Sequence, residues 1–386
     1  MHHLILALVA ALTAPLLSQS KPLRLNQIQV IGTHNSYHLE PTSPIVRLFT
    51  MGRIEWKYSH RPLKEQFQEL GVRQIELDIW PDPDGGRYAS PYGAGRGVVI
   101  EELTKPGFKV LHVPDIDYRT TVPTLRAALD QLREWSQANP RHLPILVLFE
   151  VKSDVIPDPL KLGFVRPPAI TAKDLDDLDE EIRAALPAEM LITPDDIRKN
   201  SKTLKQALAR RGWPKLDDAR GKILCALDNP GREKRLYLDG HPSLRGRVMF
   251  VDSRPGDDYM GFAKVNGPVG NVERIQQLVK AGLLVRTRSD AHTREAHDND
   301  TRRRDAALQS GAHFISTDFP EAKPEVVDSD YVVRMPDGSH ARSNPVNGPR
   351  KYDAEALLDE GLTPTPKKAV DEATGKPKKS AQRARR

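Results

Sequence analysis

The chain has 386 residues, which is long enough for one large α/β barrel or for two smaller domains. Hydrophobic residues make up 38% of the sequence and there are 32 prolines, which favours a large domain with long connections over a dense helical bundle. The formal net charge is +6, and residues 367–386 alone carry eight basic and two acidic side chains. The nearly neutral remainder therefore excludes a basic nucleic-acid-binding core.

The two ends of the chain differ in composition from the part between them. Residues 4–14 are almost wholly apolar and are followed by Pro15 and a small polar run, as in the core of a secretory signal. This run is too short to cross a bilayer comfortably. We therefore expect a signal peptide at 1–20 and a secreted or periplasmic protein. At the other end, 331–386 is predicted to be a polar extension whose basic, lysine-rich tail is disordered.

Eight segments of the body are predicted to be β-strands. The first combines the β-branched residues Ile28, Val30 and Ile31, and Gly32 ends it. The most apolar is 144–151, as expected for a strand that is covered on both faces. The other predicted strands are 72–80, 108–113, 222–227, 247–251, 283–287 and 312–316.

Helices are predicted in most of the gaps between these strands. They follow from apolar spacing of three and four residues and from start and stop residues, at 62–70, 123–135, 172–186, 194 onward, 204–210, 272–281 and 301–309. Alternation of eight strands with helices predicts a TIM-like (β/α)8 barrel. Because the gap after the second strand holds no clear helix, we expect some irregularity. A doubly wound open sheet is the alternative, but no glycine fingerprint follows the first strand.

Side chains that can exchange protons, bind a metal or carry charge stand at the ends of the first four predicted strands, where barrels carry their active sites. They are His34 and Asn35 after the first strand, Glu76 and Asp78 on the second, His112 on the third, and Glu150 and Lys152 on the fourth.

Four of these residues, Asn35, Glu76, Asp78 and Glu150, offer only oxygen ligands. That set suits calcium or magnesium and argues against zinc, which would recruit histidine or cysteine. Burying the carboxylates would cost several kcal/mol unless a cation binds them. Individual residues of this set also have simpler structural explanations. Glu150 and Lys152 could form an ion pair, and Glu76 could form a salt bridge with an outer helix.

Two histidines, His34 and His112, are left without a metal role, as general acid–base catalysis would require. Lys152 and two arginines on the seventh predicted strand, Arg286 and Arg288, are placed to meet anionic oxygens such as those of a phosphate. Asp290 and Asp318 also end strands, without an assigned role. Six further histidines, His38 and His60 among them, are interpreted as structural or surface groups.

These residues together resemble a known family. The run GTHNSY at 32–37, the E-x-D of IELDIW, the third-strand histidine and the fourth-strand E-x-K are similar to the catalytic barrel of calcium-dependent phosphoinositide-specific phospholipase C. The resemblance extends over about 25–320 and is strongest to the small bacterial branch. It implies a phosphodiesterase barrel domain at 21–330.

The resemblance also implies a role for each site residue. His34 would stabilise the phosphorane-like transition state, and His112 would protonate the departing diacylglycerol oxygen. Asn35, Glu76, Asp78 and Glu150 would bind Ca²⁺, which lowers the pKa of the inositol 2-hydroxyl. Attack of that hydroxyl on phosphorus would yield a cyclic inositol phosphate.

Two other functions compete with this one. A different phosphodiesterase, such as a glycerophosphodiesterase or a sphingomyelinase-D-like enzyme, could use the same scaffold, although the His-Arg opening usual in glycerophosphodiesterases is replaced here by His34-Asn35. A non-catalytic secreted barrel that binds lipid head groups is the second rival. We expect a monomer that takes a phospholipid or another phosphodiester and contacts a membrane surface transiently. The insertion at 37–60 is expected to pack on the body, and an apolar rim for lipid or a cap over the barrel is the alternative.

Overall fold

The computed structural model describes residues 22–43, 54–352 and 354–359. The expected signal peptide, most of the apolar part of the insertion after the first strand, and the basic tail lie outside the described residues. The strands are β1 (Ile28–Thr33), β2 (Gln74–Trp80), β3 (Lys109–Val110), β4 (Ile145–Val151), β5 (Ile223–Leu227), β6 (Met249–Val251), β7 (Phe262–Lys264), β8 (Leu284–Arg288), β9 (Phe314–Thr317) and β10 (Ala341–Ser343).

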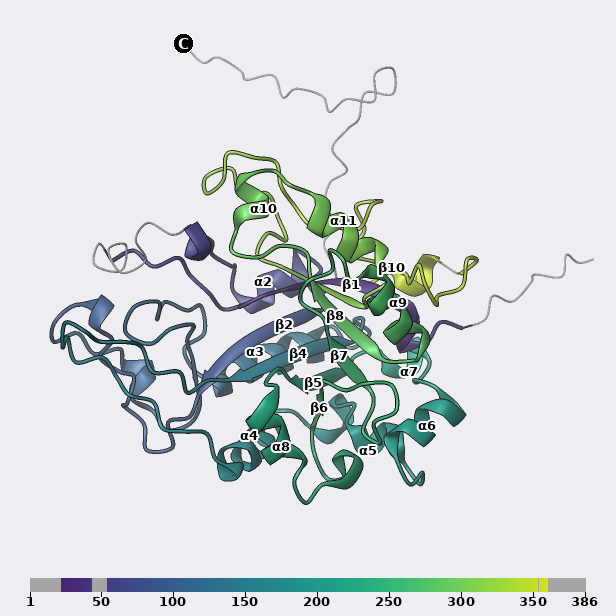
Figure 1. Cartoon of the computed structure of the whole chain (residues 1–386), viewed down its shortest axis with the longest axis horizontal. Coiled ribbons are helices and arrows are strands. Elements are labelled where there is room, and N and C mark those ends of the chain that lie inside the picture. The colour runs from purple at the N-terminus through teal and green to yellow at the C-terminus, as the bar shows by residue number, and fades with distance from the viewer. Residues whose placement is uncertain (1–21, 44–53, 353, 360–386) are drawn as a thin grey trace, which may run out of the picture.

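The strands form two five-stranded sheets that face each other across the core (Figure 1). One sheet has the order β10-β1-β9-β8-β7 and the other the order β3-β2-β4-β5-β6. All pairs are parallel except those of the two edge strands, β10 on β1 and β3 on β2. Without these two, eight strands stand in barrel order, β1-β2-β4-β5-β6-β7-β8-β9.

Two junctions complete the ring between the sheets. At the first, Arg73 N donates to Ile31 O (2.9 Å) and Ser36 N donates to Glu76 O (3.0 Å), which links β1 to β2. At the second, a parallel bridge joins Asp252 to Phe262, which links β6 to β7. The predicted (β/α)8 barrel is therefore confirmed, with the expected irregularity: it consists of two half-barrels joined by a few backbone hydrogen bonds.

One predicted strand is wrong and one barrel strand was missed. The segment 108–113 does not enter the barrel, because only Lys109 and Val110 pair, in antiparallel register, with Trp80 and Ile79. The barrel strand that replaces it in the count is β7, which has only three residues. Helix α3 (Leu125–Ala138) then occupies the connection from β2 to the next barrel strand, β4, which explains the missing helix after the second predicted strand.

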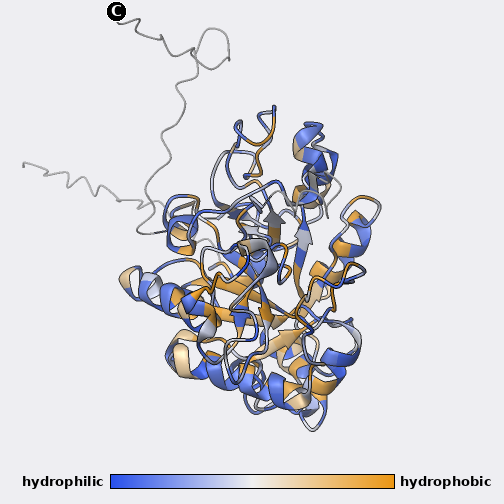
Figure 2. Cartoon of the chain, turned by 90° about the vertical axis from the view of Figure 1, so that its left-hand side faces the viewer, coloured by the Kyte–Doolittle hydropathy of each residue, from blue (hydrophilic) through white to orange (hydrophobic). Residues whose placement is uncertain are grey.

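Helices cover the outside of the ring, with apolar strands at its centre and hydrophilic faces outward (Figure 2). Three of the longer ones begin at or within two residues of the predicted start, where threonines at 124, 171 and 203 accept a hydrogen bond from the first helical turn. No helix among the described residues is long and apolar enough to cross a membrane. The α-helices are α2 (Leu63–Gln68), α3 (Leu125–Ala138), α4 (Ala172–Ala185), α5 (Pro194–Arg198), α6 (Leu204–Arg211), α7 (Leu216–Ala219), α8 (Gly231–Leu238), α9 (Val272–Lys280), α10 (Arg294–His297) and α11 (Arg302–Gln309).

The described part of the segment after residue 330 packs on the barrel. Tyr331 and Val333 are buried, and β10 extends the sheet next to β1. Further on, the short helix η7 (Ala354–Leu357) leads to Asp359, whose carboxylate forms a buried ion pair with Arg73 at the start of β2. This segment, residues 331–352 and 354–359, is called the strap below. It crosses the end of the barrel at which the strands begin.

Candidate active site

The loop after β1 depends on two positions that few residue types can occupy, Gly32 because of close packing and Asn35 because of its backbone conformation. A Cβ on Gly32 would collide with the side chain of Gln74, which packs across the β1–β2 junction and donates to Thr33 O (3.1 Å). Asn35 has φ +43°, a left-handed conformation that asparagine adopts more readily than most residues. Its Nδ2 donates to Tyr58 Oη (3.2 Å). The turn thereby presents His34 and Asn35 at the end of the strand.

His34 forms a pair with Asp318, which follows β9. Its Nδ1 donates to Asp318 Oδ1 (2.8 Å), and its Nε2 lies 3.8 Å from Glu76 Oε1. Burial, together with the charge of Arg288, lowers the pKa of His34 well below its usual value. The guanidinium of Arg288 lies 3.5 Å from Asp318 Oδ2. The orientation of the imidazole is therefore fixed, and Nε2 is the nitrogen left for a substrate.

Three carboxylates gather at the ends of neighbouring strands. Glu76 of β2, Glu150 of β4 and Asp228, directly after β5, each place a carboxylate oxygen within 4.8 Å of the other two. Burial, opposed by Arg286, raises the pKa of Glu76 to about 7, and the charge of Asp228 adds to the rise. Two of the four predicted metal ligands are thus brought together, with an acidic residue that was not predicted.

The other two predicted ligands lie at the edge of this cluster. Asp78 is buried beside Lys152, whose Nζ is 3.5 Å from Asp78 Oδ2 and 3.2 Å from Glu150 Oε1. The Oδ1 atom of Asp78 is buried and has no hydrogen-bond partner. For Asn35, Nδ2 is occupied by Tyr58, so Oδ1 is the atom that suits a cation.

The cationic residues are also held in place. Arg286 is buried, forms an ion pair with Glu76, and donates to Asn266 Oδ1 (2.6 Å) and Ser316 Oγ (3.0 Å). It connects the half-barrel of β8 and β9 to that of β2. The carboxylates of Asp78 and Glu150 outweigh the effect of burial and raise the pKa of Lys152. Every predicted substrate-binding cation therefore has at least one acidic partner.

The second candidate catalytic histidine, which is partly exposed, belongs to a triad with the buried residues His38 and Asp117. His112 Nδ1 donates to Asp117 Oδ2 (2.6 Å), and His38 Nε2 donates to both oxygens of the same carboxylate (3.0 and 2.9 Å). Burial acts to raise the pKa of Asp117, but the two histidines outweigh it and the pKa lies below its usual value. The ring of Trp56 meets His112 edge-on at 5.6 Å. Asp117 thus directs Nε2 of His112 away from the core.

Part of the insertion after β1 contacts His34 and His38 and holds them in place. Tyr58 stacks on His38 with ring centroids 4.2 Å apart and accepts from His38 Nδ1 at its carbonyl oxygen (3.0 Å). His60 Nε2 donates to His34 O (2.9 Å), and burial lowers the pKa of His60 to about 4. The described end of the insertion packs on the body, as favoured from the sequence. It contributes side chains that steady the site.

Sequence reasoning missed three members of this arrangement. Asp117 and His38 were not singled out, although a carboxylate five residues after a candidate catalytic histidine was a usable signal. Asp228 follows the apolar run of β5, and a carboxylate directly after a barrel strand was the same signal that identified Glu150. Asp318 was noted at its strand end, but the partner that reveals its role is 284 residues away.

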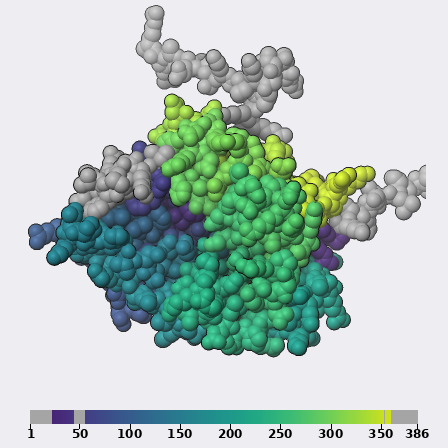
Figure 3. Space-filling view, viewed as in Figure 1, coloured from purple at the N-terminus to yellow at the C-terminus, as the bar shows by residue number. Residues whose placement is uncertain are grey.

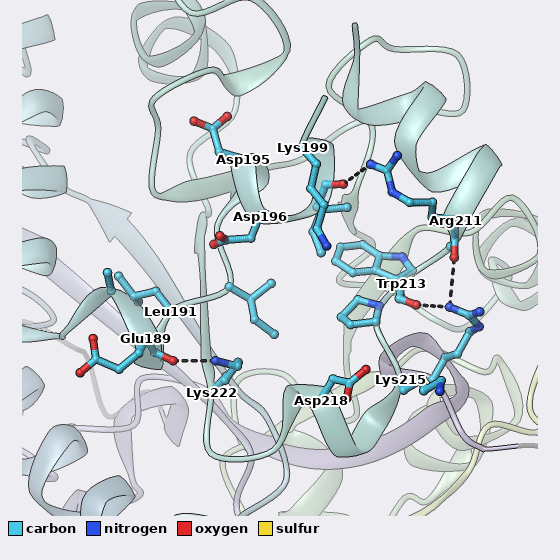
Figure 4. A pocket seen from close by; sticks show the side chains of 16 residues that line it. Glu189, Leu191, Asp195, Asp196, Lys199, Arg211, Trp213, Lys215, Asp218 and Lys222 are labelled. Atoms are coloured by element: carbon cyan, nitrogen blue, oxygen red, sulfur yellow. Dashed lines mark hydrogen bonds between the residues drawn. The ribbon is translucent and has the colours of Figure 1, made fainter. Parts of the chain in front are cut away.

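A cavity of about 660 Å³ lies elsewhere (Figure 4). Its lining includes Lys199, Asp196, Trp213 and Lys222, which belong to segments that precede β5 in the chain. Lys222 donates to Glu189 O (2.6 Å). None of the candidate site residues lines this cavity, and Lys222 marks the end at which β5 begins. The chemistry described above therefore does not belong to it.

The cluster at the strand ends has the donor chemistry of a calcium site. Its ligand atoms are oxygens, and two buried carboxylate oxygens, Oδ1 of Asp78 and Oδ1 of Asp228, lack hydrogen-bond partners. Leaving such atoms unpaired is costly, and a hard cation satisfies them. The residues present therefore fit Ca²⁺.

Comparisons with known proteins agree with this chemistry. The model of the family described as Ca²⁺-dependent phosphoinositide phospholipase C matches residues 23–345. A search of curated proteins gave no match. Among solved structures, the chain is similar to a calcium-dependent phosphoinositol-specific phospholipase C from Pseudomonas sp. (17% identity, covering 83% of this chain and 96% of that chain, TM-score 0.48). A Ca²⁺-dependent phosphatidylinositol-specific phospholipase C from Streptomyces antibioticus gives 17% identity, 80% and 98% coverage, and a TM-score of 0.48.

A glycerophosphoryl diester phosphodiesterase from Parabacteroides distasonis is less similar, with 14% identity, coverage of 82% of this chain and 92% of that chain, and a TM-score of 0.28. Since these structural similarities are low, the assignment depends on the family model, which spans most of the chain. The predicted rivals, a glycerophosphodiesterase and a sphingomyelinase-D-like enzyme, are not favoured. The chain belongs to the Ca²⁺-dependent phosphoinositide phospholipase C family.

Proposed function

We propose that this phospholipase C cleaves phosphatidylinositol-type lipids by internal attack of the inositol 2-hydroxyl on phosphorus, which releases diacylglycerol and a cyclic inositol phosphate. The observation that carries the proposal is the combination of two separate histidine–aspartate pairs with a cluster of oxygen ligands. The described site residues contain no serine–histidine–aspartate arrangement that would supply a protein nucleophile. A hydroxyl already present on the substrate avoids much of the entropic cost of recruiting one.

Each side chain has a role in this proposal. His112 acts in its doubly protonated form: Nδ1–H donates to Asp117, whose negative charge stabilises the imidazolium, and the proton on Nε2 passes to the departing diacylglycerol oxygen. His34 and Arg288 face the charge that develops on the phosphoryl oxygens. A carboxylate of the cluster takes the proton of the 2-hydroxyl. When bound by Asn35 and the acidic residues, Ca²⁺ supplies Lewis-acid assistance and charge neutralisation.

The nature of the nucleophile gives a direct test. With phosphatidylinositol, we expect phosphorus NMR to show the cyclic phosphate before any acyclic inositol phosphate. The 2-deoxy and 2-O-methyl inositol analogues should not turn over, because the internal nucleophile is missing or blocked. Comparable turnover of a blocked analogue would instead identify water as the nucleophile. Sphingomyelin and glycerophosphoinositol serve as further substrates in the same assay.

We also propose that the protein is a secreted monomer that docks transiently on lipid through the loops after β2 and β4. These loops form a lobe of blue and teal residues at one side of the molecule (Figures 1 and 3). Val98, Val99, Val155 and Leu160 are exposed on them, by 43%, 57%, 53% and 67%. Apolar side chains gathered beyond the carboxyl ends of the strands suit contact with a lipid surface.

Substitution on this lobe separates docking from chemistry. The double variant Val99→Ser/Leu160→Ser should bind phosphatidylinositol vesicles several-fold more weakly, because less apolar area enters the lipid. Its kcat on a soluble, short-chain phosphatidylinositol should equal that of the wild type. Val269→Ser, which removes an exposed valine from the connection between β7 and α9, is the matched control. Equal vesicle binding by all three proteins would exclude the lobe as the docking surface.

A further inference from the structure

Asp228 stands in register with two predicted metal ligands. In the parallel sheet Asp78 pairs with Glu150, and Phe149 pairs with Leu227. The next residue, Asp228, donates its N–H to Phe149 O (2.7 Å), so it continues the ladder at the level of Glu150. Residues in register on parallel strands point to the same side of the sheet. Asp78, Glu150 and Asp228 therefore form one row of carboxylates across three adjacent strands.

One oxygen of Asp228 is already in use and the other is not. Lys264 of β7 forms an ion pair with Oδ2 and also donates to the backbone carbonyl of Asp228 (2.9 Å). The side chain of Asp228 is held from one side by these contacts. Its Oδ1 is buried and has no hydrogen-bond partner. An ion pair with Lys264 alone does not explain why a second acceptor is kept without a donor at this position.

We infer that Asp228 is a ligand of the calcium ion, beside Glu76 and Glu150, with Lys264 as the residue that positions its carboxylate. This inference rests on the calcium site proposed above. The three oxygens already approach within 4.8 Å of one another, whereas Asp78 is not part of that group and is held by Lys152. The three acidic ligands would come from one half-barrel, from β2, β4 and the end of β5, and Asn35 would reach the ion from the loop after β1.

The charges around the row agree with this assignment. Four carboxylates, Glu76, Asp78, Glu150 and Asp228, face the three cations Arg286, Lys152 and Lys264. Carboxylate oxygens of Asp228, Glu76 and Glu150 lie within 4.8 Å of one another, close enough for their charges to repel. A divalent cation between these groups relieves that repulsion. Asp228 would thus increase calcium affinity through both its oxygen and its charge.

Calcium titration of the purified full-length protein by calorimetry tests the inference. We expect Asp228→Asn to weaken calcium binding by at least about tenfold, since even indirect disturbance of a metal site costs about 10–100-fold in affinity. Asparagine keeps an acceptor for Lys264, so the fold should be retained. Asp252→Asn is the matched control, because Asp252 directly follows the next strand, β6, and belongs to neither described group of candidate metal ligands, and asparagine keeps the Oδ1 acceptor for Lys264 N. Equal affinity of Asp228→Asn and the wild type would overturn the inference.

A second variant gives an effect of the opposite sign. Lys264→Gln removes a positive charge from beside the ion but keeps an amide N–H that can donate to Asp228 Oδ2, so the carboxylate stays positioned and calcium affinity should rise. Unchanged or weaker calcium binding by Lys264→Gln would contradict a ligand role for Asp228. This test remains available even if Asp228→Asn does not fold. The calcium-induced increase in Tm should follow the same order across the variants, because an ion that binds only the folded state stabilises it. If the wild type itself bound no calcium, the proposed site would fail, which is a different result.

Discussion

Replacement of His112 with alanine should lower kcat on phosphatidylinositol by about 10²–10⁴-fold, the usual contribution of general acid–base catalysis. The reason is that the departing diacylglycerol alkoxide is a poor leaving group unless it is protonated as the bond to phosphorus breaks. KM should change little, since His112 acts on the leaving oxygen in the transition state. Steady-state kinetics on a monomeric substrate measures both values.

Two comparisons establish that the loss is chemical. A substrate whose leaving group has a low pKa needs little protonation, so it should recover much of the lost activity in His112→Ala. Asp117→Asn should also lower kcat, because the imidazole loses the acceptor that fixes its tautomer. His292→Ala, at an exposed histidine, should behave as wild type. A loss below about threefold in His112→Ala would remove this residue from the mechanism.

The second large effect concerns stability. Asp359→Ala should lower the free energy of unfolding by about 3–5 kcal/mol, because it leaves the buried guanidinium of Arg73 without its counter-charge. The side chains of Arg73 and Asp359 are only 1% and 2% exposed. Asp359 also accepts from Leu143 N (2.9 Å). Urea denaturation should show a lower midpoint with an unchanged slope.

The matching controls separate charge burial from packing. Replacing both partners, Arg73→Met with Asp359→Leu, should restore most of the lost stability, since no buried charge remains. Lys64→Ala breaks an ion pair with Glu134 in which both side chains are about half exposed, and should cost no more than about 1 kcal/mol. Full stability of Asp359→Ala would mean that the strap does not hold the barrel.

The fold was predictable wherever the hydrophobic pattern is long. Helices such as α3, α4 and α9 and strands such as β2 and β4 have enough residues for a period to appear. The errors have the opposite cause. Strand β7 contains only Phe262, Ala263 and Lys264, too few for any period, and its place in the barrel depends on its neighbours. The run at 108–113 is largely apolar because it packs against the edge of β2 in antiparallel register, which composition alone does not distinguish from a barrel strand.

The candidate site was predictable where two polar residues share one strand. Glu76 with Asp78 and Glu150 with Lys152 are two residues apart, so each pair necessarily points to one side. Partners from distant segments carry no such signal. His38 and Asp117 are 79 residues apart and His34 and Asp318 are 284 apart, so only the folded chain reveals that each histidine has a carboxylate.

The division of the barrel into two halves has a mechanical consequence. The acidic ligands stand on or directly after β2, β4 and β5, whereas His34, Asn35, Arg288 and Asp318 stand on or after β1, β8 and β9. Direct side-chain links between the two halves include the ion pairs of Arg286 with Glu76 and of Lys264 with Asp228, and the approach of His34 to Glu76. A phosphodiester bound by both groups would act as a cross-link between the half-barrels. Substrate would therefore stiffen the molecule, and a small sliding of one half against the other would stop turnover before any helix or strand is lost.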